Sequence, residues 1–133
     1  DRFPLDSVLF PINFVNFARG DFGPQVIEHA KRKGVARLAL KAMAHRPWDA
    51  SEHHTHPKAW YKPVTDRALA RQALRFTLSE DITAAIPPGD LDNFRFAMDV
   101  AAGFTPLSAE ERAALLATTA EVEPIFRYPA VAA

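Results

Sequence analysis

Three short apolar segments, each followed by a stretch of helical spacing, constrain the fold of this chain more than any other feature. They lie near residues 7–13, 35–41 and 82–86 and are rich in Val, Ile, Leu, Ala and Phe. Apolar residues recur at helical spacing in the stretches after them, over 24–34, 67–79 and 91–102. Near-continuous apolar strands that alternate with helices are typical of a parallel sheet with helices packed outside it. We therefore predict an α/β fold.

Residues at the predicted helix ends support this assignment. Pro24 suits the first position of a helix, and Gly34 is placed to close the same helix. Ser108 and Glu111 form a Ser-x-x-Glu capping box, which predicts a final amphipathic helix over 109–121.

Two connections are predicted as loops. The first segment runs through Phe17 into a loop that contains Gly20 and Gly23. The stretch 45–65 carries three prolines and no steady period, and Asp66 after it is expected to cap the next helix. Loops of this length are usually functional or mobile.

Composition narrows the classes of partner and compartment. Sixteen basic and sixteen acidic side chains cancel among the 133 residues, so we expect neither nucleic acid nor a membrane as a partner. The absence of cysteine excludes disulfides, thiolate chemistry and cysteine-based zinc sites. No apolar stretch approaches the roughly 20 residues of a membrane span, and no signal peptide is recognisable. These features favour a cytoplasmic location.

Three parallel strands alone would leave two open apolar edges, which proteins normally cover or close. The chain is therefore interpreted as part of a barrel. Because its first residue is Asp1 and not Met, we expect it to be processed, trimmed or cut from a longer protein.

Three phrases carry a resemblance to a known family. In order and spacing, LFPINFVNF, GVARLALKAMA and ITAAIPPGDLDNF resemble strands six to eight of the aldo/keto reductase barrel. The resemblance implies a partial (β/α)8 TIM barrel, a C-terminal half-barrel of parallel strands with outer helices. Residues 1–107 would form this part of the barrel, and 108–133 a C-terminal helix and tail.

That family moves a hydride between NAD(P)H and a small carbonyl or alcohol substrate. Its catalytic Asp, Tyr, Lys and His lie in the first half of the barrel, so no residue of this chain is assigned to catalysis. The resemblance implies that this segment binds the cofactor and is inactive alone. It is expected to self-associate, pair with a complementary half-barrel or fold poorly.

The expected cofactor-binding residues lie at two strand ends. Pro88, Gly89 and Asp90 form a turn before a helix, where free backbone N–H groups can bind a phosphate. Lys41 follows an apolar strand and would reach a polar group of the cofactor, and Arg95 lies one helical turn beyond Asp90. Asp90 is equally suited to cap the helix itself. Relatives commonly carry Ser and Arg at this turn, so the choice between NAD and NADP stays open.

A histidine cluster gives a weaker metal hypothesis. His53, His54 and His56, with His45 nearby, have spacings that suit Zn, Ni or Cu. The surrounding loop offers no rigid frame, so we expect no specific metal site. The alternative function is a non-catalytic half-barrel, a binding or assembly module that lacks the catalytic tetrad.

Overall fold

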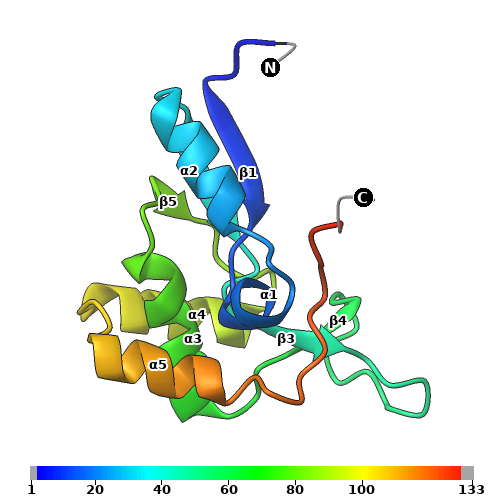
Figure 1. Cartoon of the computed structure of the whole chain (residues 1–133). Helices are drawn as coiled ribbons and strands as arrows, with labels where there is room; N and C mark the ends of the chain where they lie inside the picture. Colours follow the sequence, from blue (N-terminus) through cyan, green and yellow to red (C-terminus); the bar gives the residue numbers. More distant parts are fainter. Residues whose placement is uncertain (1–2, 130–133) are drawn as a thin grey trace.

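The computed structural model describes residues 3–129 and shows a mixed α/β fold (Figure 1). Its elements, in chain order, are β1 (Ser7–Pro11), α1 (Phe14–Arg19), α2 (Pro24–Arg32), β2 (Ala36–Leu40), β3 (Ala44–Pro47), β4 (Tyr61–Pro63), α3 (Arg67–Ser79), β5 (Ala84–Ala85), α4 (Leu91–Ala102) and α5 (Ala109–Ala117). Within this described part, no helix is long and apolar enough to cross a lipid bilayer.

The main sheet has three parallel strands in the order β1-β2-β5. Leu9 on β1 is paired with Leu38 on β2, and Leu38 is paired with Ala84 on β5. This confirms the predicted α/β class and parallel strands. The strand order also follows the chain order, so each helical connection joins two neighbouring strands.

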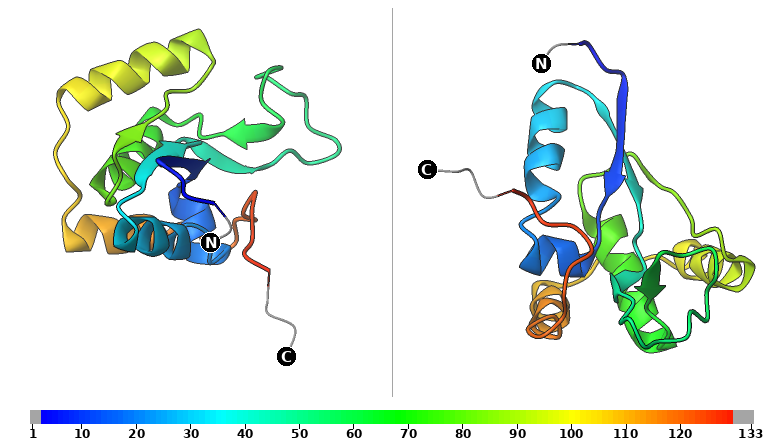
Figure 2. Two further views of the ribbon diagram at one scale, coloured as in Figure 1. Left: turned by 90° about the horizontal axis from the view of Figure 1, so that it is seen from above. Right: turned by 90° about the vertical axis from the view of Figure 1, so that its right-hand side faces the viewer.

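Helices cover only one face of this sheet. Phe10 on β1 is 5% exposed and belongs to the same buried cluster as Ile27 on α2. Figure 2 shows α2 beside β1 and β2 on one side of the sheet, and α2 contacts β2 directly. Leu9 points to the opposite face because side chains alternate along a strand, and it is 53% exposed. Parallel sheets are normally covered on both faces, so this open apolar face is unusual.

The predicted burial of 82–86 is wrong. The strand β5 has only two residues, Ala84 is exposed and Ile86 is 43% exposed. Hydrogen bonds to β2 nevertheless extend from Thr83, whose N–H donates to the Arg37 carbonyl, to Ile86, whose N–H donates to the Ala39 carbonyl. The segment is extended as predicted, but it forms the edge of a sheet with one uncovered face, so Ala84 and Ile86 remain exposed while Ile82 packs against the core.

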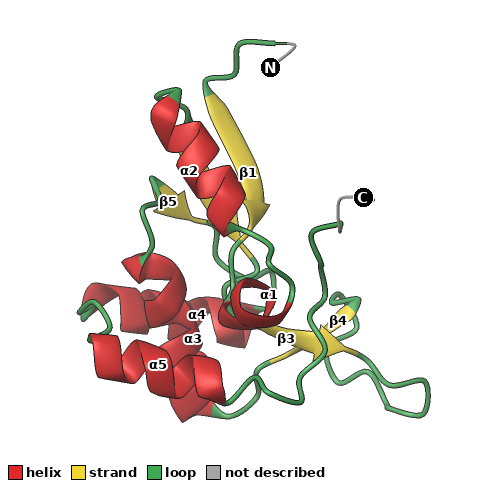
Figure 3. Ribbon diagram, viewed as in Figure 1, coloured by secondary structure: helices red, strands yellow, loops and turns green. Residues whose placement is uncertain are grey.

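Two segments predicted as loops contain regular structure. Residues 14–19 form the helix α1 because the Asn13 side chain accepts a hydrogen bond from the Asn16 N–H at 2.9 Å. Within 45–65, the strands β3 and β4 form an antiparallel pair below the main sheet (Figure 3). Glu52 fastens the loop between them, because it accepts hydrogen bonds from Arg46 at 2.8 Å and from Lys62.

The predicted helix ends are confirmed. Pro24 is the first residue of α2, and Gly34 follows that helix with a positive φ of 67°. The Asp66 side chain caps α3 by accepting from the Leu69 N–H. Ser108 and Glu111 form a reciprocal capping box at the start of α5, although this helix ends at Ala117 and not at 121.

The C-terminal tail packs across the end of α1 beside the β3–β4 pair (Figure 1). The Phe126 ring stacks on Phe22 and meets Trp60 edge to face, with ring centres 5.4 and 5.7 Å apart. Gly20 lies under this tail, and a Cβ at that position would come within 2.2 Å of the Phe126 carbonyl oxygen. These contacts anchor the tail to the rest of the fold.

Candidate functional site

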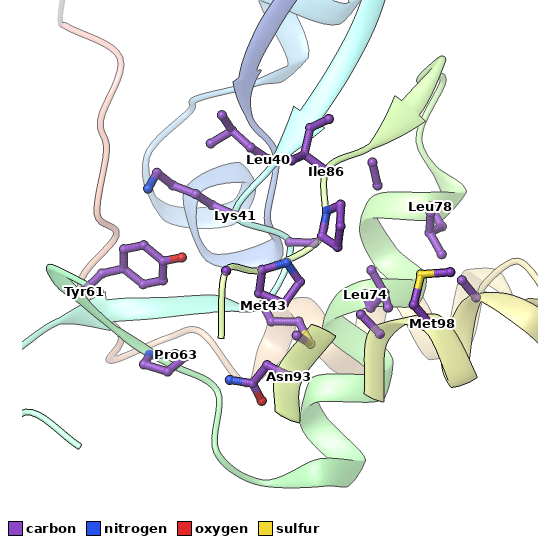
Figure 4. Close-up of a pocket in the computed structure, with 17 residues that line it drawn as sticks. Leu40, Lys41, Met43, Tyr61, Pro63, Leu74, Leu78, Ile86, Asn93 and Met98 are labelled. Carbon is purple, nitrogen blue, oxygen red and sulfur yellow. The ribbon is translucent and has the colours of Figure 1, made fainter. Parts of the chain in front are cut away.

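The carboxyl ends of β2 and β5 open into a cavity of about 310 Å³, here called the first hollow (Figure 4). Its walls come from β2 and the turn after it, from β4, and from α3, β5 and α4. The lining side chains are mostly apolar, with Lys41, Tyr61 and Asn93 as the polar exceptions. Ligands of α/β proteins bind at this end of parallel strands.

A second hollow of about 360 Å³ adjoins the first. The two share Tyr61, Pro63, Pro88, Gly89 and Asn93 as lining residues, so they form one divided cleft. Of the predicted cofactor-binding residues, Lys41, Pro88 and Gly89 line the first hollow, whereas Pro88, Gly89 and Asp90 line the second. The structure therefore brings four of the five predicted residues to one cleft.

Lys41 is held at the rim of the first hollow by its backbone and by two aromatic rings. Its φ of 64° is in the left-handed region, because the chain turns sharply from β2 into β3. The ammonium lies 4.4 Å from the ring centre of Tyr61 and 4.9 Å from that of Trp60. Among residues 3–129, no carboxylate forms an ion pair with Lys41. Burial lowers the pKa of this lysine below its ordinary value.

Tyr61 and Asn93 add two neutral groups to the cleft. Burial raises the pKa of the Tyr61 hydroxyl above its ordinary value, so this group remains a protonated donor at neutral pH. Asn93 on α4 is 7% exposed, and its Oδ1 accepts a hydrogen bond from Arg67 at 2.9 Å. Because Arg67 takes the carbonyl oxygen, the NH₂ group of the amide is left as the free donor.

The side chain of Asp90 already caps the start of α4. The Asp90 carboxylate accepts from the Asn93 N–H at 2.9 Å, which is the capping role that sequence analysis left open for this residue. Arg95 lines neither hollow; its guanidinium lies 3.9 Å from the Asp92 carboxylate, and both side chains are mostly exposed. Asp90 at the N-cap and Asp92 in the first turn therefore place two carboxylates at this helix end.

The histidine cluster lies on the loop between β3 and β4. His54 stacks on Trp48 with ring centres 4.6 Å apart, and His56 lies 3.0 Å from the Thr55 hydroxyl. In the described part of the chain, no three His, Asp or Glu side chains come together as a metal site would require. That this loop holds no specific metal ion remains a prediction.

Sequence reasoning missed the role of Asn93. The apolar residues Phe94, Ala97, Met98 and Ala101 give 91–102 its helical spacing, but Phe94 and Met98 are exposed and Ala97 is buried together with Asn93. One feature of the sequence could have indicated this role: Asn93 is a polar residue three positions after the capping residue Asp90, in the first turn of the helix. Asn13 and Asn16 are buried: the Asn13 side chain caps α1, and the Asn16 side-chain oxygen accepts from the Phe126 N–H of the tail.

No family model matches this sequence, and no curated protein or solved structure matches the chain. The described cleft combines hydrogen-bond donors with apolar walls, an arrangement typical of sites that bind small molecules.

Proposed function

We propose that this chain is the cofactor-binding portion of an NAD(P)H-dependent oxidoreductase of the aldo/keto reductase type. The observation that carries the proposal is the divided cleft at the carboxyl ends of β2 and β5, beside the start of α4. The complete protein would reduce a small carbonyl compound or oxidise an alcohol. The comparisons lend no support to this family, so the proposal rests on the cleft, the strand order and the resemblance of the three strand phrases.

The proposed architecture is a partial (β/α)8 barrel, with β1, β2 and β5 as three consecutive strands. Two observations support it. The strand order in space repeats the order in the chain, as in a barrel. The uncovered sheet face carries the apolar side chains of Leu9 and Leu38 in register, and this face would line the barrel interior.

The residues of the cleft fit a nicotinamide cofactor in part. Lys41 supplies the cation that a phosphate or amide oxygen requires, and Pro88 and Gly89 offer a bare backbone, since a Cβ at Gly89 would meet nothing within 4 Å. Asp90 and Asp92 oppose an additional phosphate at the helix end. The cofactor supplies the hydride, and this chain's residues bind and orient it.

A second candidate is the assembly module, which one observation favours. The chain exposes 8143 Å², about 1,100 Å² more than a folded monomer of its mass of 14.8 kDa is expected to expose. One partner in a standard interface buries about 800 Å². Among the exposed large apolar side chains are Leu9, Ile86, Leu91, Phe94 and Met98, which lie on the sheet and on α4.

The experiment that tests cofactor binding is a fluorescence titration with NADH and NADPH, because Trp60 lies beside Lys41 at the cleft. We expect saturable quenching that Lys41→Ala weakens and that Lys31→Ala on α2 leaves unchanged. Weaker nucleotide binding by Arg95→Ala would indicate that a cofactor phosphate reaches beyond the rim of the second hollow. Absence of saturable quenching by either nucleotide would contradict the proposal.

Sedimentation tests the assembly module separately. Association that Leu9→Gln abolishes, together with no nucleotide binding, would favour the module over the oxidoreductase. A monomer at all concentrations would exclude a self-associating module.

A further inference from the structure

The first hollow has a distinct electrostatic character. Of the described residues that line it, Lys41 is the only charged one, and none is acidic. An ammonium in partly buried surroundings is stabilised when an anion lies beside it. In the structure, only the faces of Trp60 and Tyr61 fulfil this role.

The polar side chains that line the hollow can all donate hydrogen bonds. The Lys41 ammonium donates and cannot accept, and the Asn93 side chain keeps its NH₂ group as a donor while its carbonyl oxygen accepts from Arg67. Within residues 3–129, the Tyr61 hydroxyl has no hydrogen-bond partner, so it is free to donate to an incoming acceptor. Three donors, one of them a cation, suit a group that consists of acceptors alone.

The opposite end of the hollow is apolar. Figure 4 shows Leu74, Leu78 and Met98 on one side of the cavity, and Lys41 with Tyr61 on the other. These apolar side chains come from α3 and α4, so the wall belongs to two helices that contact each other. A ligand that fills the hollow therefore needs one polar end and one hydrocarbon end.

We infer that the first hollow binds an apolar monocarboxylic acid, with its carboxylate at the Lys41 end and its hydrocarbon part against the helical wall. A carboxylate brings one negative charge, which matches the single ammonium. A phosphate dianion would leave one charge unbalanced, because the formal charges of Lys58 and Asp90 in the second hollow cancel. The inference goes beyond the proposed function, because it requires no nicotinamide ring, no barrel closure and no redox step.

The test uses the whole 133-residue chain and three probes of equal length: octanoate, 1-octanol and octylammonium. Calorimetric titration at low ionic strength should show that octanoate binds more tightly than octanol, and that octylammonium does not bind. Charge-assisted hydrogen bonds predict a difference of about tenfold or more between octanoate and octanol. Equal binding of the acid and the alcohol, or no binding of octanoate, would overturn the inference.

Matched variants locate the site. Lys41→Asn removes the charge with a residue that tolerates a positive φ, so the turn is retained, and it should weaken octanoate about tenfold without changing octanol. Lys41→Arg keeps the charge and should keep most of the affinity, and Lys31→Asn on α2 should change nothing. A Lys41→Asn chain that is folded by circular dichroism and binds octanoate as tightly as the parent chain would also overturn the inference.

Adding NADH to the octanoate titration separates this inference from the proposed function. Octanoate binding without nucleotide binding would leave the inference standing and contradict the oxidoreductase proposal. Nucleotide binding without octanoate binding would do the reverse.

Discussion

The Lys41 ammonium lies 4.4 Å from the centre of the Tyr61 ring. Lys41 directly follows β2 of the parallel sheet, whereas Tyr61 is the first residue of β4 in the antiparallel pair. This contact closes the space between the parallel sheet and the β3–β4 pair. It places a cation at the rim of the cleft and connects the long loop to the carboxyl end of the parallel strands.

The positive φ of Lys41 leads to a stability prediction that is independent of any ligand. Lys41→Gly and Lys41→Ala both remove the side chain, but only glycine adopts a φ of 64° without cost. We expect the glycine variant to be more stable than the alanine variant by about 1–2 kcal/mol in urea unfolding. Gly34→Ala, at a φ of 67° in open space, is the matched control and should be destabilising by a similar amount. Equal stability of the two Lys41 variants would mean that this turn carries no strain.

Gly20 provides a test of the anchored tail. A Cβ at Gly20 would come within 2.2 Å of the Phe126 carbonyl, so Gly20→Ala must displace the tail. We expect a lower melting temperature and faster tryptic cleavage after Arg127. Gly103→Ala is the control, because Gly103 also ends a helix at a negative φ and has nothing within 4 Å. If both variants behave alike, the tail does not depend on this close approach.

The predicted helices were largely right because their signals are local. Pro24, Asp66 and the Ser108–Glu111 box lie within a few residues of the helix ends that they determine. The β3–β4 pair was missed because its strands have three or four residues and pair across a 13-residue loop, which no local period reveals. The exposure of Ile86 was missed for a different reason: an apolar run indicates a strand but does not say whether a neighbour covers it.

The candidate site likewise has parts that follow from local sequence and parts that depend on distant contacts. Lys41, Pro88 and Gly89 were readable because strand ends are where parallel sheets bind ligands. Asn93 was not, since its role depends on Arg67, 26 residues earlier on another helix.

Glu52 gives the loop a defined pH dependence. Hydrogen bonds from Arg46 and Lys62 lower the pKa of this carboxyl below its ordinary value of 4.5. The folded state therefore favours the charged form, and the stabilisation is present above about pH 4.5 and lost as the pH falls below it. We expect Glu52→Gln to lower the melting temperature at about pH 7, and we expect this difference to narrow progressively as the pH falls from about 4.5 to about 2. A gap that stays constant across this range would show that the ion pairs contribute nothing to the folded state.

Thr77 tests the contact between α3 and the end of β1. Its buried hydroxyl donates to the Ile12 carbonyl at 2.9 Å. Thr77→Val keeps the shape but leaves that carbonyl without the donor, which should cost about 1–3 kcal/mol in urea unfolding. Thr77→Ser should restore most of the loss. A neutral Thr77→Val would mean that another group satisfies the Ile12 carbonyl.

The most direct test of the central claim, that the divided cleft binds a nicotinamide cofactor, is amide chemical-shift mapping of the isotope-labelled chain during titration with NADH and NADPH. The account predicts that the shifts cluster at Lys41, Tyr61, Gly89 and Asn93, which line the cleft. No shifts with either nucleotide, or shifts confined to the groove between α2 and residues 3–8, would contradict it.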